Sequence, residues 1–361
     1  MAANLVLSFI VAFVISFLIT PLTIWAYRKL GWLDDPQKAS HPKVIHRYPV
    51  PRGGGIPVFL GLLIATLLFL PLDKHLTGIL LGAGVLFVLG ILDDRWDLNP
   101  YWRLLAGFVA AGFVVGSGIG IPFISNPFGG VIHLNQPQIP IFFLGKLRTI
   151  WIAADLFAFF WIVSCMNFVN WSKGVDGQLP GVVVIAALTI AALSLRFSAD
   201  ITQWSVTILA LILAGAYLGF LPFNFYPQKI MAGYGAGTLA GYLLAVLSIL
   251  STTKVGTAMM VLGVPLVDAV FVLLRRLAVG QSPVWGDTRH LHHKLLSLGW
   301  SKRQVALFYW GVTAILGFLS LHLQAPQKLF TILLLAIALG IFLLWYKLFA
   351  TSWKPPDRDN G

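Results

Sequence analysis

The chain of 361 residues has no glutamate, one cysteine and little charge of either sign, since charged residues make up 11% of it. Soluble domains carry about 25% charged residues, which excludes an ordinary soluble domain of this length. Cys165 stands alone, so an intrachain disulfide is excluded as well. Because glutamate is absent, all 13 acidic residues are aspartates. They cluster, which indicates binding or catalytic sites rather than helix surfaces, where glutamate is the better helix former.

Hydrophobic residues are correspondingly abundant. They make up 58% of the chain, and the mean hydropathy is +0.85. Apolar runs long enough to cross about 30 Å of hydrocarbon predict an all-α polytopic membrane protein with about eleven transmembrane helices, a single domain over residues 1–361. The predicted spans are 4–27, 55–72, 77–92, 103–121, 151–169, 180–196, 203–221, 238–253, 257–274, 304–322 and 328–348.

The loops between these spans form two alternating sets that differ in basic residues. One set, which includes the C-terminal tail counted from Lys347, holds 19 of the 25 Lys and Arg residues. Because Lys and Arg concentrate in cytoplasmic loops, we expect this set in the cytoplasm, with the N-terminus outside and the C-terminus cytoplasmic. The net charge of +12 follows from this loop bias, so no nucleic-acid partner is expected. The set comprises 28–54, 93–103, 170–179, 222–237, 275–303 and the tail.

Three aspartates follow directly on a predicted span, in the stretch DDRWD. Asp93 and Asp94 are adjacent, and Asp97 follows. Adjacent carboxylates repel each other and are costly near lipid unless a cation lies between them. Such oxygen-rich sites suit Mg²⁺, which takes further ligands from water and substrate phosphates. Alternatively, the stretch is a solvated interfacial turn in which Asp97 caps the next helix.

A histidine-rich stretch, HLHHK, lies in another predicted cytoplasmic loop. It contains His290, His292 and His293, with Arg289 before and Lys294 after. Side chains of these types bind phosphate or transfer protons. A zinc site is a competing interpretation, although the single cysteine lies in a different loop and the usual paired ligand spacing is absent. A surface loop that is merely rich in histidine is a further interpretation.

Two more loops on this side carry glycines. The sequence RGGG at 52–55 is typical of either a backbone nest for phosphate or a tight turn into the next span. Gly233, Gly237 and Gly241 recur every four residues, a spacing that lets transmembrane helices approach closely or, alternatively, cradles a phosphate.

Paired carboxylates, basic side chains and glycine turns thus gather on one side of a membrane protein. This combination suits a reaction between a lipid and a soluble anionic substrate. Phosphoryl transfer is the natural class, because metals and cations stabilise phosphate charge in the transition state.

Over nearly its whole length the chain resembles the polyprenyl-phosphate N-acetylhexosamine-1-phosphate transferases of glycosyltransferase family 4. The last stretch, with His-x-His-His before a basic residue, is similar to the branch that transfers GlcNAc-1-phosphate. The motifs that carry the resemblance are PVPRGGG, ILDDRWDLNPYWRLL, MNFVNWSKGVDG, LGFLPFNFYP, VPLVDAVFVLLRR and GDTRHLHHKLLSLGW.

The resemblance implies a cleft that faces the cytoplasm in the cell membrane. There a UDP-N-acetylhexosamine would give its sugar 1-phosphate to polyprenyl (undecaprenyl) phosphate with release of UMP, as the first membrane step of cell-envelope polysaccharide synthesis. It also implies Mg²⁺ or Mn²⁺ as cofactor, and a homodimer is a further prediction.

Residue by residue, the resemblance assigns catalysis to Asp93, Asp94 and His290. For an active transferase we expect Asp93, Asp94 and Asp176 to hold the metal. The substrate-binding residues that we expect are Arg47, Arg52, Asn170, Lys173, Asp176, Asn224, Arg289, His292 and His293.

The chain departs from the family pattern at two acidic positions. Lys173 stands where the family usually has an aspartate that contacts the nucleotide, and Tyr234 stands where it usually has the principal magnesium ligand. The site thereby loses two negative charges and gains one positive charge.

These departures leave alternatives open. One is a catalytically silent relative that binds nucleotide-sugar or lipid phosphate. A membrane prenyltransferase would use DDRWD as a diphosphate motif, but leaves the histidines unexplained. A transporter would permit clustered charge, yet no polar residues are apparent at the middle of the bilayer.

Overall fold

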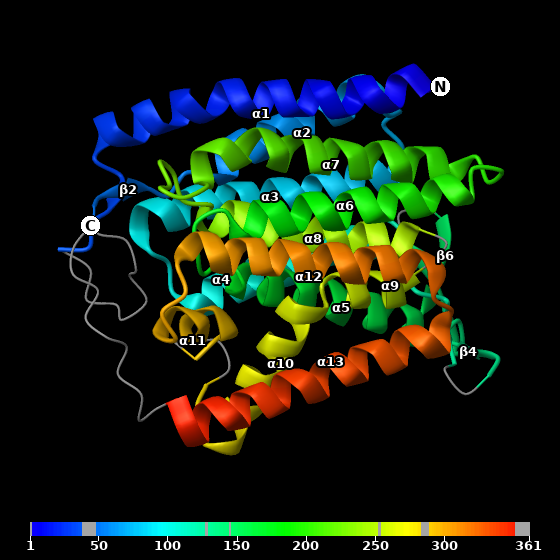
Figure 1. The fold of residues 1–361 in the computed structure, drawn as a ribbon. Coiled ribbons are helices and arrows are strands. Elements are labelled where there is room, and N and C mark those ends of the chain that lie inside the picture. Colours follow the sequence, from blue (N-terminus) through cyan, green and yellow to red (C-terminus); the bar gives the residue numbers. More distant parts are fainter. Residues whose placement is uncertain are drawn as a thin grey trace.

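The computed structural model describes residues 2–37, 48–126, 129–143, 146–251, 254–282 and 289–350. Helices that run along a common direction form one bundle (Figure 1). Within the described residues, eight helices are long and apolar enough to cross a membrane, or up to nine if a bent pair is one span. The predicted all-α fold of a multi-pass membrane protein is therefore confirmed.

The helices are interrupted by three two-stranded antiparallel sheets, β1–β2, β3–β4 and β5–β6. The helices in chain order are α1 (Ala2–Leu30), α2 (Gly55–Phe69), α3 (Lys74–Trp96), α4 (Pro100–Gly116), α5 (Ile152–Trp171), α6 (Gln178–Arg196), α7 (Thr202–Asn224), α8 (Gly233–Leu250), α9 (Lys254–Val261), α10 (Gly263–Ala278), α11 (Leu291–Ser297), α12 (Lys302–His322) and α13 (Ala325–Trp345). A short π-helix, η1 (Tyr346–Ala350), follows. The strands are β1 (Leu33–Asp34), β2 (Val50–Pro51), β3 (Phe123–Ser125), β4 (Val131–His133), β5 (Gln138–Phe143) and β6 (Lys146–Trp151).

Every predicted span overlaps a helix, but the span predicted at 257–274 is not one straight helix. Val255–Val261 and Gly263–Ala278 meet at 85°. Pro265 explains the break, because proline lacks an N–H and its ring clashes with the carbonyl four residues earlier, here that of Val261. Helices α2 and α4 are shorter apolar helices. The count of eleven and the orientation stay predictions.

Helix α8 forms the centre of the bundle, with 89% of its apolar window buried. Its glycines permit close contact with α5. A Cβ added at Gly237 would lie 2.1 Å from Asn170 Oδ1, and one at Gly241 would lie 2.2 Å from the carbonyl oxygen of Cys165. The four-residue glycine repeat therefore serves helix packing, one of the two interpretations that the sequence left open.

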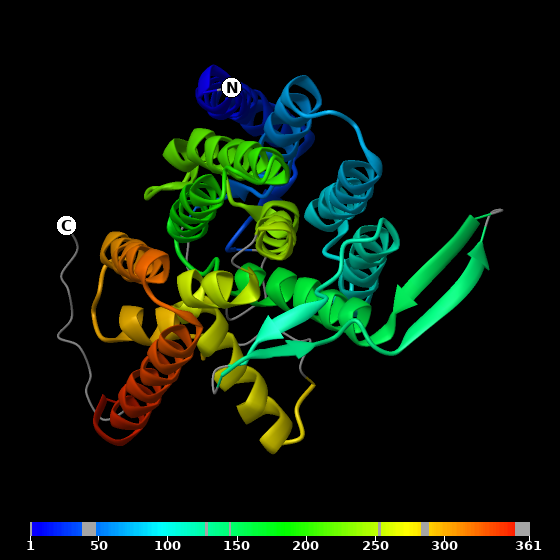
Figure 2. The same ribbon diagram turned by 90° about the vertical axis from the view of Figure 1, so that its right-hand side faces the viewer.

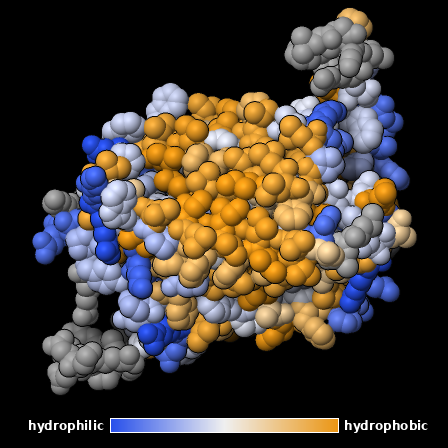
Figure 3. Space-filling model, turned by 90° about the horizontal axis from the view of Figure 1, so that it is seen from above, coloured by the Kyte–Doolittle hydropathy of each residue, from blue (hydrophilic) through white to orange (hydrophobic). Residues whose placement is uncertain are grey.

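The outer surface of the bundle is apolar. Figure 3 shows an apolar band across the middle of one face and hydrophilic residues gathered at its two ends. Helix α13 has only 6% of its apolar window buried. This distribution matches a protein whose sides contact hydrocarbon and whose ends contact water.

The two ends of the bundle differ in structure. β2 and α11 lie at one end, and β4 and β6 lie at the other (Figure 1). The residues 122–151 contain the pairs β3–β4 and β5–β6. The hairpin β5–β6 projects away from the helices (Figure 2).

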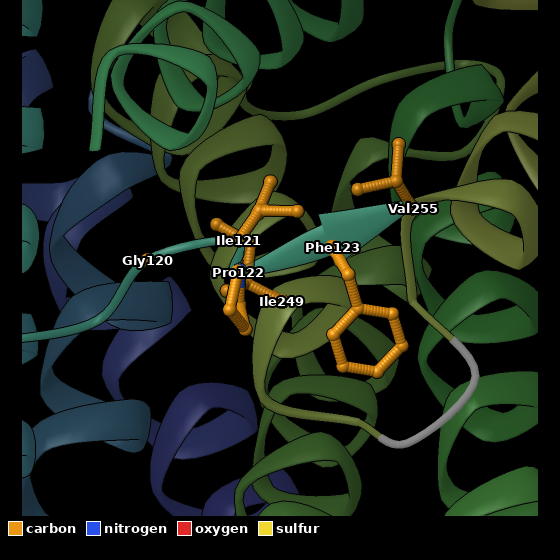
Figure 4. A pocket seen from close by; sticks show the side chains of 6 residues that line it. All are labelled: Gly120, Ile121, Pro122, Phe123, Ile249 and Val255. Atoms are coloured by element: carbon orange, nitrogen blue, oxygen red, sulfur yellow. The ribbon is translucent and has the colours of Figure 1, made fainter. Parts of the chain in front are cut away.

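A small hollow lies beside β3, where α8 ends and α9 begins. It is lined by Gly120, Ile121, Pro122, Phe123, Ile249 and Val255 (Figure 4). None of these side chains is charged or titratable, so the hollow has no means of catalysing phosphoryl transfer. The polar side chains gather instead at the end that holds β2 and α11.

Candidate active site

A short loop between α5 and α6, residues 172–177, touches three groups of polar side chains. Lys173 donates a hydrogen bond to the carbonyl oxygen of Gly233. The next residue, Gly174, packs so tightly on His292 that a Cβ there would lie 1.9 Å from its Nε2. Gly177 donates its backbone N–H to Asn224 Oδ1 at 3.1 Å. Loops far apart in the chain therefore meet around this one segment.

The first group, the carboxylate cluster, comprises Asp93, Asp94 and Asp97 with Arg52, Arg103 and Lys173. Asp93 is fully buried. Its Oδ1 accepts hydrogen bonds from Arg103 Nε at 2.5 Å and from the backbone N–H of Leu98 at 3.1 Å. A buried carboxylate needs such pairing, because removing a charge from water costs several kcal/mol, about as much as a good ion pair returns.

The turn after α3 brings this pairing about. Asp97 ends α3 in a left-handed conformation, with φ 45°. Arg103, in the first turns of α4, then reaches back to both Asp93 and Asp97 and binds the latter at 2.6 Å. Arg52, from the segment before α2, lies 3.7 Å from a carboxylate oxygen of each.

Asp94 is held differently from Asp93. Tyr27 of α1 donates its hydroxyl to Asp94 Oδ2 at 3.2 Å. Across the described part of the chain, Asp94 Oδ1 and Asp93 Oδ2 are buried and have no hydrogen-bond partner. Neither oxygen is held by a hydrogen bond, although Arg52 Nη2 lies 3.7 Å from Asp93 Oδ2. Mg²⁺ needs only one or two protein carboxylates when waters and substrate phosphates supply the rest. The pair fits a divalent metal that binds together with a phosphate ligand.

Lys173 is the third cation of the carboxylate cluster. Burial and, to a smaller extent, the nearby Arg52 lower the pKa of its ammonium to about 7, while Asp93 acts in the opposite direction. Gly233, whose carbonyl oxygen accepts the bond from Lys173, has φ +64°. A Cβ at Gly233 would lie 2.7 Å from Asp94 Oδ1, so glycine allows α8 to begin directly against the aspartates.

Tyr234 ties the cluster to α8 without adding charge. Its hydroxyl donates to the carbonyl oxygen of Arg103 at 2.8 Å. The guanidinium of Arg103 also lies 5.8 Å from the centroid of the Tyr234 ring, within the range of a cation–π interaction. Tyr234 therefore fixes the segment that carries Arg103.

The second group, the amide cluster, comprises Asp176, Asn224, Gln228 and Lys302. Asp176 is buried, and its oxygens accept from Lys302 Nζ at 3.3 Å and from the backbone N–H of Gln228 at 3.3 Å. Asn224 donates to the carbonyl oxygen of Ile230 at 2.8 Å. These contacts join the loop before α6 to the loop before α8.

Asp176 therefore belongs to a different cluster from Asp93 and Asp94. Lys302 neutralises its charge, and no group of three or more His, Cys, Asp or Glu residues in the described ranges is arranged to hold a metal. Of the three predicted metal ligands, the structure brings together only the adjacent pair.

The third group, the histidine cluster, comprises His290, His292 and His293 with Asp268. His290 Nδ1 lies 2.8 Å from Asp268 Oδ2. The His290 and His292 rings stack with centroids 5.7 Å apart, and those of His292 and His293 are 4.3 Å apart. Burial, with smaller contributions from His293 and His290, holds the pKa of His292 well below its usual range, so this ring is neutral.

Asn170, Arg289 and Arg47 were also predicted to bind substrate. Asn170 lies against Gly237 of α8, and its buried Oδ1 has no hydrogen-bond partner among the described residues. Arg289 is exposed beside His290. Arg47 lies outside the described residues.

Five residues that belong to these groups or contact them were missed by the sequence interpretation: Tyr27, Arg103, Gln228, Asp268 and Lys302. Arg103 carried a signal, since it follows the aspartates within the same loop. Asp268 carried a stronger one, because it is an ionisable residue inside an otherwise apolar helix, where such residues are rare and functional. Tyr27 and Lys302 had none, since their contacts depend on how distant helices pack.

Comparison with known proteins relates the whole chain to one family. The profile of glycosyl transferase family 4 matches residues 76–252. A probable undecaprenyl-phosphate N-acetylglucosaminyl 1-phosphate transferase of Bacillus subtilis is 30% identical over 362 residues, which cover 98% of this chain and 95% of that protein.

More distant bacterial relatives have similar names. A decaprenyl-phosphate N-acetylglucosaminephosphotransferase of Mycolicibacterium smegmatis is 29% identical over 306 residues, 76% of this chain and 72% of that protein. An undecaprenyl-phosphate alpha-N-acetylglucosaminyl 1-phosphate transferase of Thermotoga maritima is 29% identical over 282 residues, 78% of each chain. With matches that span nearly its full length, the chain belongs to glycosyl transferase family 4.

Proposed function

We propose that the protein transfers N-acetylglucosamine 1-phosphate from a UDP-sugar to polyprenyl phosphate and releases UMP. The observation that carries the proposal is the loop of residues 172–177, which joins paired carboxylates, fixed cations and histidines at one end of a membrane bundle. The names of the relatives, which specify N-acetylglucosaminyl phosphate and undecaprenyl or decaprenyl phosphate, support it.

In this reaction an oxygen of the lipid phosphate attacks the phosphorus that carries the sugar. A new phosphorus–oxygen bond forms, the bond between the two phosphates of the nucleotide breaks, and UMP leaves with the bonding electrons. Negative charge accumulates on the transferred group, and fixed cations stabilise it. Arg52 and Lys173 are suited to this role because both lie beside Asp93 and Asp94.

Phosphoryl transfer from nucleotides commonly uses a divalent metal. We propose that Asp93 and Asp94 hold Mg²⁺ or Mn²⁺ through Asp93 Oδ2 and Asp94 Oδ1, which accept no hydrogen bond within the described residues. When bound, the metal would supply additional positive charge to the diphosphate. Asp176, which is paired with Lys302, is proposed to contact the nucleotide instead.

The remaining predicted residues complete the proposal. Asn170 and Asn224 contact the nucleotide-sugar, and His290, His292, His293 and the basic residues Arg47 and Arg289 surround its diphosphate. We also propose that this end faces the cytoplasm, which the bias of Lys and Arg supports, and that the chain is one domain in the cell membrane. A homodimer stays a prediction that a mass measurement in detergent or nanodiscs would check.

The test uses the full chain in nanodiscs that contain undecaprenyl phosphate. With UDP-GlcNAc and Mg²⁺ or Mn²⁺, we expect UMP release and a lipid-linked sugar, both lost in Asp94→Asn. UDP-GalNAc and UDP-glucose under the same conditions define the sugar. No UMP from any UDP-N-acetylhexosamine at saturating metal would overturn the transferase proposal.

A second candidate is a catalytically silent relative that binds the same ligands. The observation that favours it is the cationic surroundings of Asp93 and Asp94, with Lys173 and the uncharged Tyr234 at positions where the family usually has aspartates. It predicts that UDP-GlcNAc binds, by calorimetry, without any turnover.

A further inference from the structure

Asp268 is a buried carboxylate to which neither the sequence motifs nor the relatives' names assign a role. It lies on α10, after the 85° bend, and it is 2% exposed. A buried charge inside a membrane helix is costly and needs a specific partner. Its partner comes from α11, 22 residues away in the chain, where His290 Nδ1 lies 2.8 Å from Asp268 Oδ2.

Both oxygens of this carboxylate contact the start of α11. Oδ2 faces the His290 ring, and Oδ1 accepts the backbone N–H of Leu291 at 2.9 Å. One side chain therefore fixes both the ring and the backbone that carries it. This geometry exceeds what simple neutralisation of a charge requires.

An ionised carboxylate can only accept hydrogen bonds, so the proton of this contact belongs to His290 Nδ1. The ring is thereby set with Nδ1–H directed at Asp268 and Nε2 as its remaining functional nitrogen. A carboxylate on Nδ1 also stabilises positive charge on an imidazole, as in the serine protease triad. His290 is thus prepared to bind an anionic oxygen or to hold a proton at Nε2.

The surroundings of His290 connect it to the rest of the site. Its ring centroid lies 6.4 Å from that of Trp171, the last residue of α5. Lys173, two residues after Trp171 in the chain, donates to the carbonyl oxygen of Gly233 beside the carboxylate cluster. His292, stacked on His290, is neutral and adds no competing charge.

We propose that Asp268 is a positioning residue, which holds His290 with Nδ1–H directed at its carboxylate, so that Nε2 is left to accept a proton and, once protonated, to donate it to a phosphate oxygen of the substrates. The identity of those substrates rests on the proposed function, whereas the tautomer does not. Asp268 itself touches no substrate.

The decisive variant is Asp268→Asn, which keeps the size of the side chain. Its amide can still accept the Leu291 N–H, but its NH₂ group would face His290 Nδ1 and favour the opposite tautomer. We expect kcat for UMP release to fall by about 100-fold or more, the range of a lost acid–base contribution, with KM for UDP-GlcNAc changed less than threefold. We expect the melting temperature to change little.

The tautomer has a readout that does not require turnover. In protein labelled with ¹⁵N-histidine, the His290 resonances, assigned with His290→Gln, should report Nδ1–H in the wild type and Nε2–H in Asp268→Asn. Asp268→Glu retains a carboxylate and should keep the Nδ1–H tautomer and more activity than Asp268→Asn. The matched control is Asp155→Asn, at the opposite end of α5, where Asp155 also accepts a backbone N–H, that of Trp151 at 3.1 Å.

The outcomes separate this inference from the proposed function. If the wild type releases no UMP but His290 has the Nδ1–H tautomer and loses it in Asp268→Asn, the transferase proposal fails and the positioning role stands. If the His290 resonances are the same in the wild type and Asp268→Asn, or if Asp155→Asn loses as much activity as Asp268→Asn, the positioning role is overturned.

Discussion

The carboxylate cluster and the histidine cluster flank the same loop but balance their charge in opposite ways. Around Asp93 and Asp94 lie three cations, two of them guanidinium groups that lie 2.5 and 3.7 Å from the oxygens of Asp93. In the histidine cluster a single carboxylate, Asp268, faces a titratable ring. The first arrangement controls how much charge the site offers to a phosphate or metal, whereas the second controls where one proton lies.

Replacing Asp93 tests the charge balance of the carboxylate cluster and should lower stability and activity more than any other variant below. Asp93→Asn leaves Arg103 beside a neutral amide in a buried position. Breaking a buried ion pair costs about 3–5 kcal/mol, and we expect the lower end because Arg103 is partly exposed. Thermal unfolding in detergent measures the loss, and UMP release should be abolished.

Asp97→Asn is the control for this prediction. Asp97 binds the same Arg103, but half of its side chain is exposed. Its loss should cost less than 1 kcal/mol, as exposed ion pairs do. Equal destabilisation by the two variants would contradict the view that burial makes the Asp93 pair important.

Gly174→Ala should disturb the histidine cluster and spare the carboxylate cluster. The added Cβ would lie 1.9 Å from His292 Nε2, so the ring or the loop must move. Overpacking of this kind costs about 1–3 kcal/mol. We expect a lower melting temperature and lower kcat, with metal binding measured by calorimetry unchanged.

The matched variant is Gly112→Ala on α4, where an added Cβ meets no atom within 4 Å. It should leave stability and turnover within error of the wild type. Should Gly174→Ala behave like Gly112→Ala, the tight contact between the loop and the histidines would be disproved.

The smallest expected change concerns metal affinity. The double variant Lys173→Asp, Tyr234→Asp removes one cation and adds two carboxylates near Asp93 and Asp94. We expect Mn²⁺ to bind roughly tenfold more tightly than in the wild type, equivalent to about 1.4 kcal/mol. Electron paramagnetic resonance measures free Mn²⁺, and the melting temperature should rise more with metal than it does for the wild type.

A substitution in the histidine cluster that leaves the charge unchanged is the control for this result. His292→Gln removes a neutral ring, so it should leave Mn²⁺ affinity as in the wild type. Unchanged affinity in the double variant would show that Lys173 and Tyr234 do not limit metal binding.

Much of the fold was predictable from the sequence, and the site was predictable in part. Apolar runs locate helices because membrane spans have a required length and composition. The adjacent pair Asp93 and Asp94 lies in one cluster, since neighbours in the chain stay neighbours in space, and its metal binding stays a prediction. Grouping Asp176 with them was not supported, because Lys302, from a helix more than a hundred residues further along, neutralises it.

The sequence by itself determined that this is a helical membrane protein with polar motifs gathered in one set of loops. Composition and the spacing of apolar runs suffice for that, since hydrocarbon excludes unpaired backbone groups. Only the tertiary structure decided which polar side chains meet. Asp268 reaches His290 and Lys173 reaches Gly233 because a proline breaks a helix and glycines let others approach closely. Hydrogen bonds and ion pairs act over a few ångströms, so these pairings depend on helix packing that no local pattern specifies.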